Sequence, residues 1–237
     1  MEFGQIVAPT IKELFIEKIE GMIFSGALKP GDKLPSEREL AEQMKISKTI
    51  VHLGLENLAN MGFIEVTPRR GTVVTDFAET GNLETLNAIL RYNGGKLDRQ
   101  MAISIIELRS AVEGGALVRL SRNHTDADIE ELRNILNDMV SMEKSGASAS
   151  SVAAQLAKFH YKVCTLSGNR LFPLIMNAFR NVGNVLWESS VRFWGVSALY
   201  EQDMHIVNLI AEGKGEEASE YLDSLFEHYI QKTCDNY

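Results

Sequence analysis

The stretch Leu28-Lys29-Pro30-Gly31-Asp32-Lys33-Leu34-Pro35-Ser36-Glu37-Arg38-Glu39-Leu40-Ala41 carries the strongest structural signal in this chain. Its first half places Pro and Gly at the spacing of a turn. Its second half opens a short helix, expected over Ser36 to Met44, in which Ser36 and Glu39 form a capping box. A capping box satisfies two backbone N–H groups in the first helical turn. The stretch therefore predicts a turn followed by a sharply started helix.

Two further helices are expected on either side of this stretch. Residues Thr10 to Ser25 place apolar side chains at helical spacing, and Gly26 follows them. On the other side, Ser47 caps a helix that runs to about Met61. Only Lys45-Ile46 separates this helix from the one before it. Two helices joined by so short a turn are typical of a helix-turn-helix.

A β-hairpin is expected directly after the third helix. The β-prone runs 63–66 and 72–74 flank Pro68-Arg69-Arg70-Gly71, which has the composition of a tight turn. A hairpin in this position is the wing of a winged helix-turn-helix. We therefore expect a DNA-binding domain over residues 1–76.

The remainder, residues 77–237, reads as helices throughout, so the fold class is mainly α. Gly-rich or polar breaks divide it into a bundle of six to seven helices. Residues 76–81 are the expected joint between the two domains. A helical bundle of this size can bind a ligand between its helices and can also form a dimer.

Composition narrows the class of protein further. The chain has 237 residues, a net charge of −8 and no apolar run long enough to span a bilayer, which predicts a cytoplasmic protein without a membrane partner. The only cysteines, Cys164 and Cys234, form no C-x-x-C pair, so no thiolate zinc site is expected. Within this acidic chain, residues 43–55 hold Lys45, Lys48 and His52 and no acid. A local basic face is typical of a sequence-specific DNA binder.

The fourteen-residue stretch and the wing Arg70-Gly71-Thr72-Val73-Val74 resemble the GntR family of bacterial regulators. The second part is similar to the FadR branch of that family, on the motifs Glu107-Leu108-Arg109 with Glu113, Phe159-His160 and Ser167-Gly168-Asn169. The resemblance implies a transcription regulator rather than an enzyme, with a helical effector-binding and dimerisation domain. Residues 77–86 are also similar to the joint and first helix of the fatty-acid-responsive member. An acyl-coenzyme A-responsive regulator is therefore the alternative.

The residues expected to contact DNA lie on the second and third helices and on the wing. They are Ser36, Arg38, Ser47, Lys48, Thr49, His52, Arg69, Arg70 and Gly71. Lys48 and His52 are four residues apart and share one helix face. They stand where relatives commonly carry Arg, and Leu53-Gly54 replaces Glu-Ala, so we expect a different operator sequence. The operator itself is expected to be palindromic double-stranded DNA, bound by a homodimer.

The residues expected to bind the effector are Arg109, His160, Asn169 and His205. Arg109 lies in a largely apolar helix, and a charge is rarely buried unpaired. Its partner is therefore Glu107, Glu113 or the carboxylate of a ligand. The resemblance favours the ligand, so the expected effector is a small anionic metabolite.

A metal is the remaining question for this domain. Some members of the branch hold a metal with one Asp and three His. Here Leu156 takes the place of the Asp, and the register of the following helix puts Asp203 where a His is usual. We therefore expect no cofactor and no metal. A divalent metal on His160, His205 and His228 remains the alternative, and with it a metal-dependent hydrolase. The chain has no H-E-x-x-H, G-x-S-x-G or P-loop motif and no expected catalytic residue.

Overall fold

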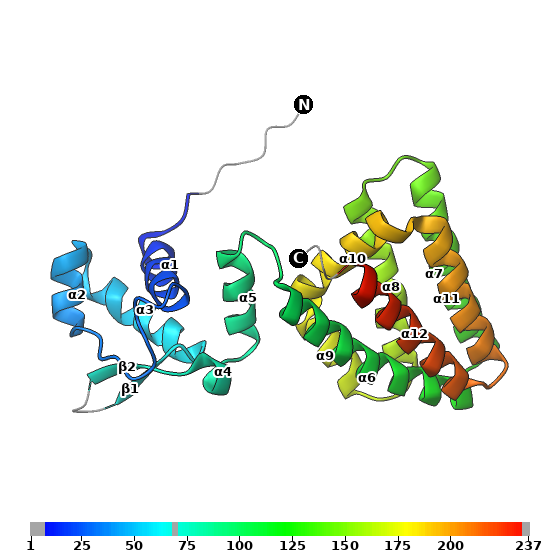
Figure 1. Ribbon diagram of the computed structural model, residues 1–237, viewed down its shortest axis with the longest axis horizontal. Helices are drawn as coiled ribbons and strands as arrows, with labels where there is room; N and C mark the ends of the chain where they lie inside the picture. Colours follow the sequence, from blue (N-terminus) through cyan, green and yellow to red (C-terminus); the bar gives the residue numbers. More distant parts are fainter. Residues whose placement is uncertain (1–7, 68–70, 234–237) are drawn as a thin grey trace. The chain divides into compact units, whose positions relative to one another are not determined.

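A computed structural model of the chain describes residues 8–67 and 71–233. The chain divides into two compact units, residues 1–94 and 95–237. Figure 1 labels the helices and strands of both units. Within the described residues, no helix is both long enough and apolar enough to cross a membrane.

Unit 1 contains the expected winged helix-turn-helix. Its first three helices are α1 (Ile11–Phe24), α2 (Glu37–Met44) and α3 (Lys48–Asn60). The capping box of Ser36 and Glu39 is present, and the Ser47 side chain caps α3 through the backbone N–H of Ile50. Lys45 adopts a left-handed conformation with φ 54°, which ends α2 and turns the chain toward α3. The sequence prediction of a two-residue turn between these helices is confirmed.

The hairpin consists of β1 (Ile64–Thr67) and β2 (Gly71–Val74), an antiparallel pair in which Ile64 faces Val74 and Thr67 faces Gly71. Gly71 has φ 93°, a conformation that residues with a side chain rarely adopt, and it starts the returning strand. Hydrogen bonds tie the turn before α2 to the hairpin, because the Leu34 N–H donates to the Thr72 carbonyl. The wing is therefore anchored to the turn that precedes the helix-turn-helix.

Helix α3 packs against α1 at unusually short range. Gly54 is buried on the side of α3 that faces α1, and a Cβ placed on it would lie 2.3 Å from Cδ1 of Phe15. The missing side chain therefore lets the Phe15 ring contact the α3 backbone. This close contact explains why a glycine, which costs about 1 kcal/mol in a helix interior relative to alanine, occupies this position.

Unit 1 extends past the expected joint at residues 76–81. Helices α4 (Phe77–Thr80) and α5 (Leu83–Tyr92) belong to it. The Asn82 side chain donates to the Asn60 carbonyl at 2.7 Å, the Thr85 hydroxyl donates to the Met61 carbonyl, and Ala88 is buried in the unit 1 core. The winged helix elements end near residue 76 as predicted, but these hydrogen bonds move the end of the compact unit to Gly94.

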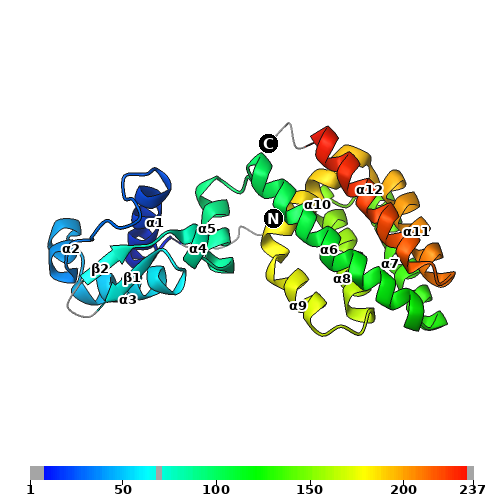
Figure 2. The ribbon, with the colours of Figure 1, turned by 60° about the horizontal axis from the view of Figure 1, so that its bottom comes forward.

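Unit 2 is a bundle of seven helices among the described residues: α6 (Arg99–Asn123), α7 (Asp126–Lys144), α8 (Ala149–Leu166), α9 (Leu171–Ala178), α10 (Arg180–Trp194), α11 (Val196–Ala211) and α12 (Gly215–Thr233). Figure 2 shows α6 running beside α12, and α7 beside α11. The described residues of 77–237 contain nine helices rather than the expected six to seven, because α4 and α5, which belong to unit 1, precede the seven of this unit. Apolar side chains from α6, α7, α8, α10, α11 and α12 form one core.

Candidate functional site

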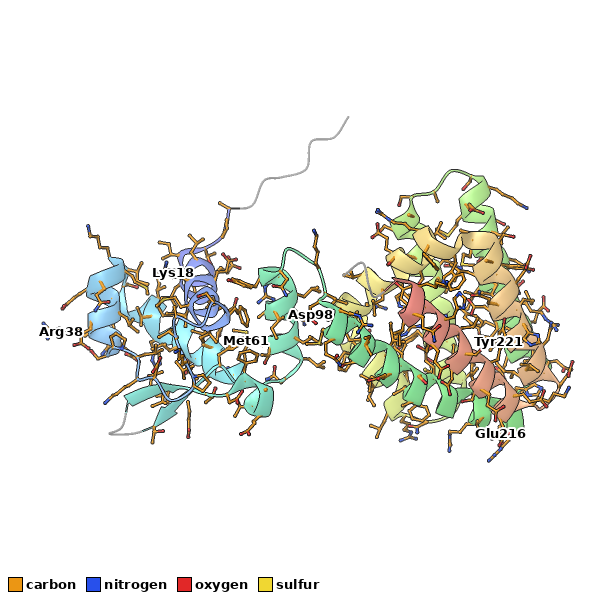
Figure 3. The ribbon with its side chains drawn as sticks, viewed as in Figure 1. Lys18, Arg38, Met61, Asp98, Glu216 and Tyr221 are labelled. Atoms are coloured by element: carbon orange, nitrogen blue, oxygen red, sulfur yellow. The ribbon has the colours of Figure 1, made fainter. Side chains whose placement is uncertain are left out.

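The expected DNA-binding residues of α2 and α3 form an exposed face of unit 1. Ser36, Ser47, Lys48, Thr49 and His52 begin or follow the first turns of these two helices, and Ser47, Lys48, Thr49 and His52 are exposed. Figure 3 shows Arg38 on α2 pointing away from the body of the unit. Because a recognition helix presents its first turns to the major groove, the arrangement is suited to DNA contact.

Each cation of this face is already paired with a carboxylate of the same unit. Arg38 Nε donates to Glu42 at 3.0 Å, and Glu37 lies 3.7 Å from Lys48 Nζ and 2.8 Å from His52 Nδ1. The hydrogen bond to Glu37 raises the pKa of His52, and the nearby Glu37 charge adds to this effect. Exposed pairs of this kind exchange easily with water and ions. DNA phosphates can therefore replace the carboxylates as partners of these cations.

Of the three expected wing residues, one lies within the described structure. Gly71 begins β2 in the conformation given above. Arg69 and Arg70 lie outside the described residues. The hairpin and Gly71 therefore make up the described part of the wing.

Unit 2 places four ionisable side chains together in its interior, and we call them the buried ion cluster: Arg109 and Glu113 of α6, His160 of α8 and Asp203 of α11. Arg109 and Glu113 meet because residues four apart lie on the same face of a helix. Arg109 Nε donates to Glu113 Oε1 at 2.8 Å, and His160 Nδ1 lies 2.7 Å from Glu113 Oε2. His160 Nε2 is 3.8 Å from Asp203 Oδ1. Of the expected partners of Arg109, Glu113 is the one that binds it.

Aromatic rings enclose the cluster. The Cζ atom of Arg109 lies 3.4 Å from the ring centre of Trp187 on α10 and 4.7 Å from that of Phe226 on α12. The imidazole of His160 stacks on the same Trp187, with ring centres 4.4 Å apart. Cation–π contact stabilises a desolvated guanidinium. Trp187 is therefore part of the site.

The pKa values of the two carboxyl groups of the cluster are shifted in opposite directions. Burial by itself would raise the pKa of Glu113, but the Arg109 and His160 charges and hydrogen bonds outweigh it and lower the pKa to about 2. Burial raises the pKa of Asp203 to about 6, because His160 compensates it only in part. Ionised Glu113 only accepts hydrogen bonds, so His160 Nδ1 donates to it. His160 Nε2 then faces Asp203.

Two polar atoms of the cluster have no hydrogen-bond partner among the described residues: Arg109 Nη2 and Asp203 Oδ2. Both residues line one cavity of about 40 Å³, together with His160, Leu156 and Trp187. A buried donor or acceptor without a partner is costly, so such atoms require an explanation. The cavity has room for a few water molecules or for a very small ligand.

Two of the expected effector residues lie elsewhere. His205 is exposed on α11, and its ring contacts Tyr221 of α12, which Figure 3 labels. The Asn169 side chain accepts from the Leu171 N–H before α9, so it acts as a local turn residue. The structure therefore brings together Arg109 and His160 of the predicted set, and it adds Glu113, Asp203 and Trp187. The helix register had placed Asp203 where a His is usual, and its position on the apolar face of α11 between Leu199 and Ile206 was the signal that it belongs to the site.

The donor set for a metal does not converge. Leu156 is buried beside the cluster and cannot ligate a metal. His205 lies against Tyr221, and the exposed His228 lies against Trp194. Both oxygens of Glu113 are engaged by Arg109 and His160. No group of three or more potential ligands able to hold a metal occurs within the described parts of the chain. The residues present therefore do not fit the metal that some members of the branch hold.

A winged helix-turn-helix with an exposed cationic face, together with a helical bundle whose small cavity is lined by an ion cluster, defines a DNA-binding regulator with a sensory domain. The family model described as bacterial regulatory proteins, gntR family, matches residues 12–74, and the model of the FCD domain matches residues 104–228. The chain therefore belongs to the gntR family of bacterial transcription regulators and carries an FCD domain, in which these regulators bind their effectors.

Relatives of known name agree with this assignment. The HTH-type transcriptional regulator LutR of Bacillus subtilis (strain 168) is 31% identical over 206 residues, covering 83% of this chain and 89% of LutR. The fatty acid metabolism regulator protein of Shewanella frigidimarina (strain NCIMB 400) is 28% identical over 171 residues, covering 72% of this chain and 68% of that protein. A solved structure of Lar, which controls expression of the Listeria monocytogenes agr system, shares the fold with a TM-score of 0.59 at 16% identity, covering 95% of this chain and 97% of that one.

Proposed function

We propose that this transcription regulator is gated by a small anionic metabolite bound at the buried ion cluster. The observation that carries the proposal is the pair of buried atoms without partners, Arg109 Nη2 and Asp203 Oδ2, on one cavity. A ligand carboxylate would accept from Nη2, and a hydroxyl or amine of the same ligand would donate to Oδ2. The proposal assigns no catalytic step to the chain and no metal to the cluster.

The thermal stability of the full-length protein tests this proposal. We expect one of acetate, 2-hydroxypropanoate, 2-aminopropanoate or succinate to raise the melting temperature, because a ligand at one hundred times its Kd adds about 2.7 kcal/mol. A chelator should not change the effect. Arg109→Lys keeps the charge but loses the planar fork, so it should abolish the rise. The matched control is Arg122→Lys, at an exposed pair with Glu216.

A second panel separates the alternative effector. Residues 77–86 and the fatty-acid-regulator relative support testing acetyl- and long-chain acyl-coenzyme A beside the small acids. If an acyl thioester stabilises the protein and the small acids do not, and if Arg109→Lys leaves that stabilisation unchanged, the effector is an acyl-coenzyme A rather than a small anion. Stabilisation by a small acid only when zinc, nickel or manganese is added would overturn the metal-free part and bring His160, His205 and His228 back as candidate ligands.

For the DNA-binding half, we propose that a homodimer contacts a palindromic operator through Ser36, Arg38, Ser47, Lys48, Thr49, His52, Arg69, Arg70 and Gly71. The support is the exposed face of α2 and α3. Selection of bound duplexes from a random pool would give the operator, and analytical ultracentrifugation would give the number of chains on it. A single chain on a site without two half-sites would contradict the dimer.

A further inference from the structure

A second cavity of unit 2 lies beside the buried ion cluster and is not part of it. It measures about 340 Å³ and lies between one face of α8 and the segment formed by α9 and α10. We call it the α8–α10 pocket. Its volume is within the range of small-molecule sites, whereas the cavity at the ion cluster is about 40 Å³.

The polar groups of the α8–α10 pocket are suited to an anion. Lys158 of α8 and Arg180 of α10 line it from its two sides, and none of its described lining residues is acidic. Neither cation has an ion-pair partner among the described residues. In contrast, Lys162, one turn further along α8, lies 2.7 Å from Glu131, and Arg192 on α10 lies 2.5 Å from Glu188. Lys158 and Arg180, unlike Lys162 and Arg192, are therefore available to bind an anionic ligand.

The apolar part of the pocket is suited to a flat group. Ala154 and Ala157 lie on the face of α8 that also carries Lys158, and their small side chains leave space. Opposite them lie Met176 and the buried indole of Trp187. Aromatic rings and thioethers both form favourable contacts with a planar apolar body.

We propose that the α8–α10 pocket is a second ligand site, which binds an organic anion with a flat apolar body, such as an aromatic carboxylate. The anionic group lies between Lys158 and Arg180, and the flat body lies against Trp187. This site is separate from the small-anion site proposed above, but the two share the Trp187 side chain as a wall. Trp187 also contacts Arg109 and His160, so this one side chain connects a ligand in the pocket with the ion cluster.

Fluorescence of the full-length protein tests the second site. The chain has two tryptophans, so Trp194→Phe leaves Trp187 as the reporter. We expect benzoate and phenyl phosphate to change the emission with saturation, and benzamide, which is neutral, to leave it unchanged. Loss of one charge-assisted contact lowers affinity by about tenfold or more. Lys158→Ala and Arg180→Ala should each show this loss, whereas Lys162→Ala and Arg192→Ala should not.

The same titration separates this site from the ion cluster. Benzoate binding that persists in Arg109→Lys, with Lys158→Ala still weakening it, supports two sites even if no small anion binds at the cluster. The proposal is overturned if neither probe gives a saturable change at millimolar concentration. It is also overturned if the Lys158 and Arg180 variants bind like their controls, or if Arg109→Lys abolishes benzoate binding while the variant retains the cooperative melting of the parent.

Discussion

Each unit contains an Arg–Glu ion pair within one helix, and the pair is exposed in unit 1 and buried in unit 2. In α2, Arg38 Nε donates to Glu42 Oε1 at 3.0 Å, and in α6, Arg109 Nε donates to Glu113 Oε1 at 2.8 Å. Both pairs have the same four-residue spacing. The side chains of the first pair are 84% and 65% exposed, and those of the second are 7% and 2% exposed. Spacing therefore determines that such a pair forms, whereas burial determines what it can do.

Arg38 can exchange its carboxylate partner for another anion, whereas Arg109 cannot. An ion pair in water adds little stability, so Arg38 can leave Glu42 for a phosphate at small cost. The buried pair holds charges that have lost their water, and removal of one partner leaves the other uncompensated. The DNA-binding face therefore exchanges its partners, whereas the ion cluster keeps fixed partners and leaves two defined atoms for a ligand.

Removal of Glu113 should give the largest effect in this comparison. Glu113→Ala leaves Arg109 charged, buried and without its carboxylate, which destabilises unit 2 by about 3–5 kcal/mol. Urea denaturation followed by circular dichroism measures the change, and Glu42→Ala in the exposed pair is the matched control. Equal stability losses in the two variants would show that burial does not distinguish the pairs.

Asp203 should give a smaller effect that depends on pH. Its pKa is raised from 3.8 to about 6 by burial, so the folded state holds the Asp203 proton more tightly than the unfolded state. Its contribution to stability is therefore present below pH 4 and is lost as the pH rises through about 6. The loss amounts to at most about 3 kcal/mol. Relative to the parent, Asp203→Asn should become more stable as the pH increases from 4 to 7.

The control for this prediction is the other carboxyl group of the cluster. Glu113 has a lowered pKa, so it contributes stability above its ordinary value of 4.5 that is lost as the pH falls toward 2. The difference in stability between Asp203→Asn and the parent, measured by melting curves between pH 4 and pH 7, isolates Asp203, because both proteins contain Glu113 and share its contribution. A constant difference between Asp203→Asn and the parent over this range would contradict the assignment.

Substitutions on the exposed face of α2 and α3 should change stability least. Their effect is measured as DNA affinity. Glu37→Gln removes the carboxylate beside Lys48 and His52, so both cations become available to phosphates. Operator affinity should increase by up to about tenfold, while the melting temperature stays close to that of the parent. The matched variant Lys48→Ala should instead weaken binding and change the log–log salt slope by about 1. Weaker DNA binding by Glu37→Gln would show that Glu37 orders the face for DNA.

Most of the fold could be predicted from patterns of residues that are close in sequence. The capping box at Ser36 and the turn at Lys45-Ile46 depend on residues close in sequence, and the structure has them as predicted. Helix α5 was assigned to the wrong side of the joint, since the hydrogen bond of Thr85 to Met61 joins residues far apart in sequence.

The site was less accessible to sequence reasoning. Arg109 was identified because a charge in an apolar helix needs a partner, and Asp203 gives the same signal on α11. His205 was a candidate because some members of the branch that the chain resembles hold a metal with three histidines, but it lies two residues from Asp203 and on the exposed side of the helix. Trp187 could not be assigned because its contacts with Arg109 and His160 come from two other helices, α6 and α8.

The contact between Gly54 and Phe15 connects the interior of unit 1 with the choice of DNA sequence. The Phe15 ring determines how close α3 can come to α1, and Gly54 is the position that permits this distance. A methyl group at Gly54 would push α3 outward, and with it the side chains of Lys48 and His52 on the opposite face. Operator preference in this protein can therefore evolve through a residue that never touches a base.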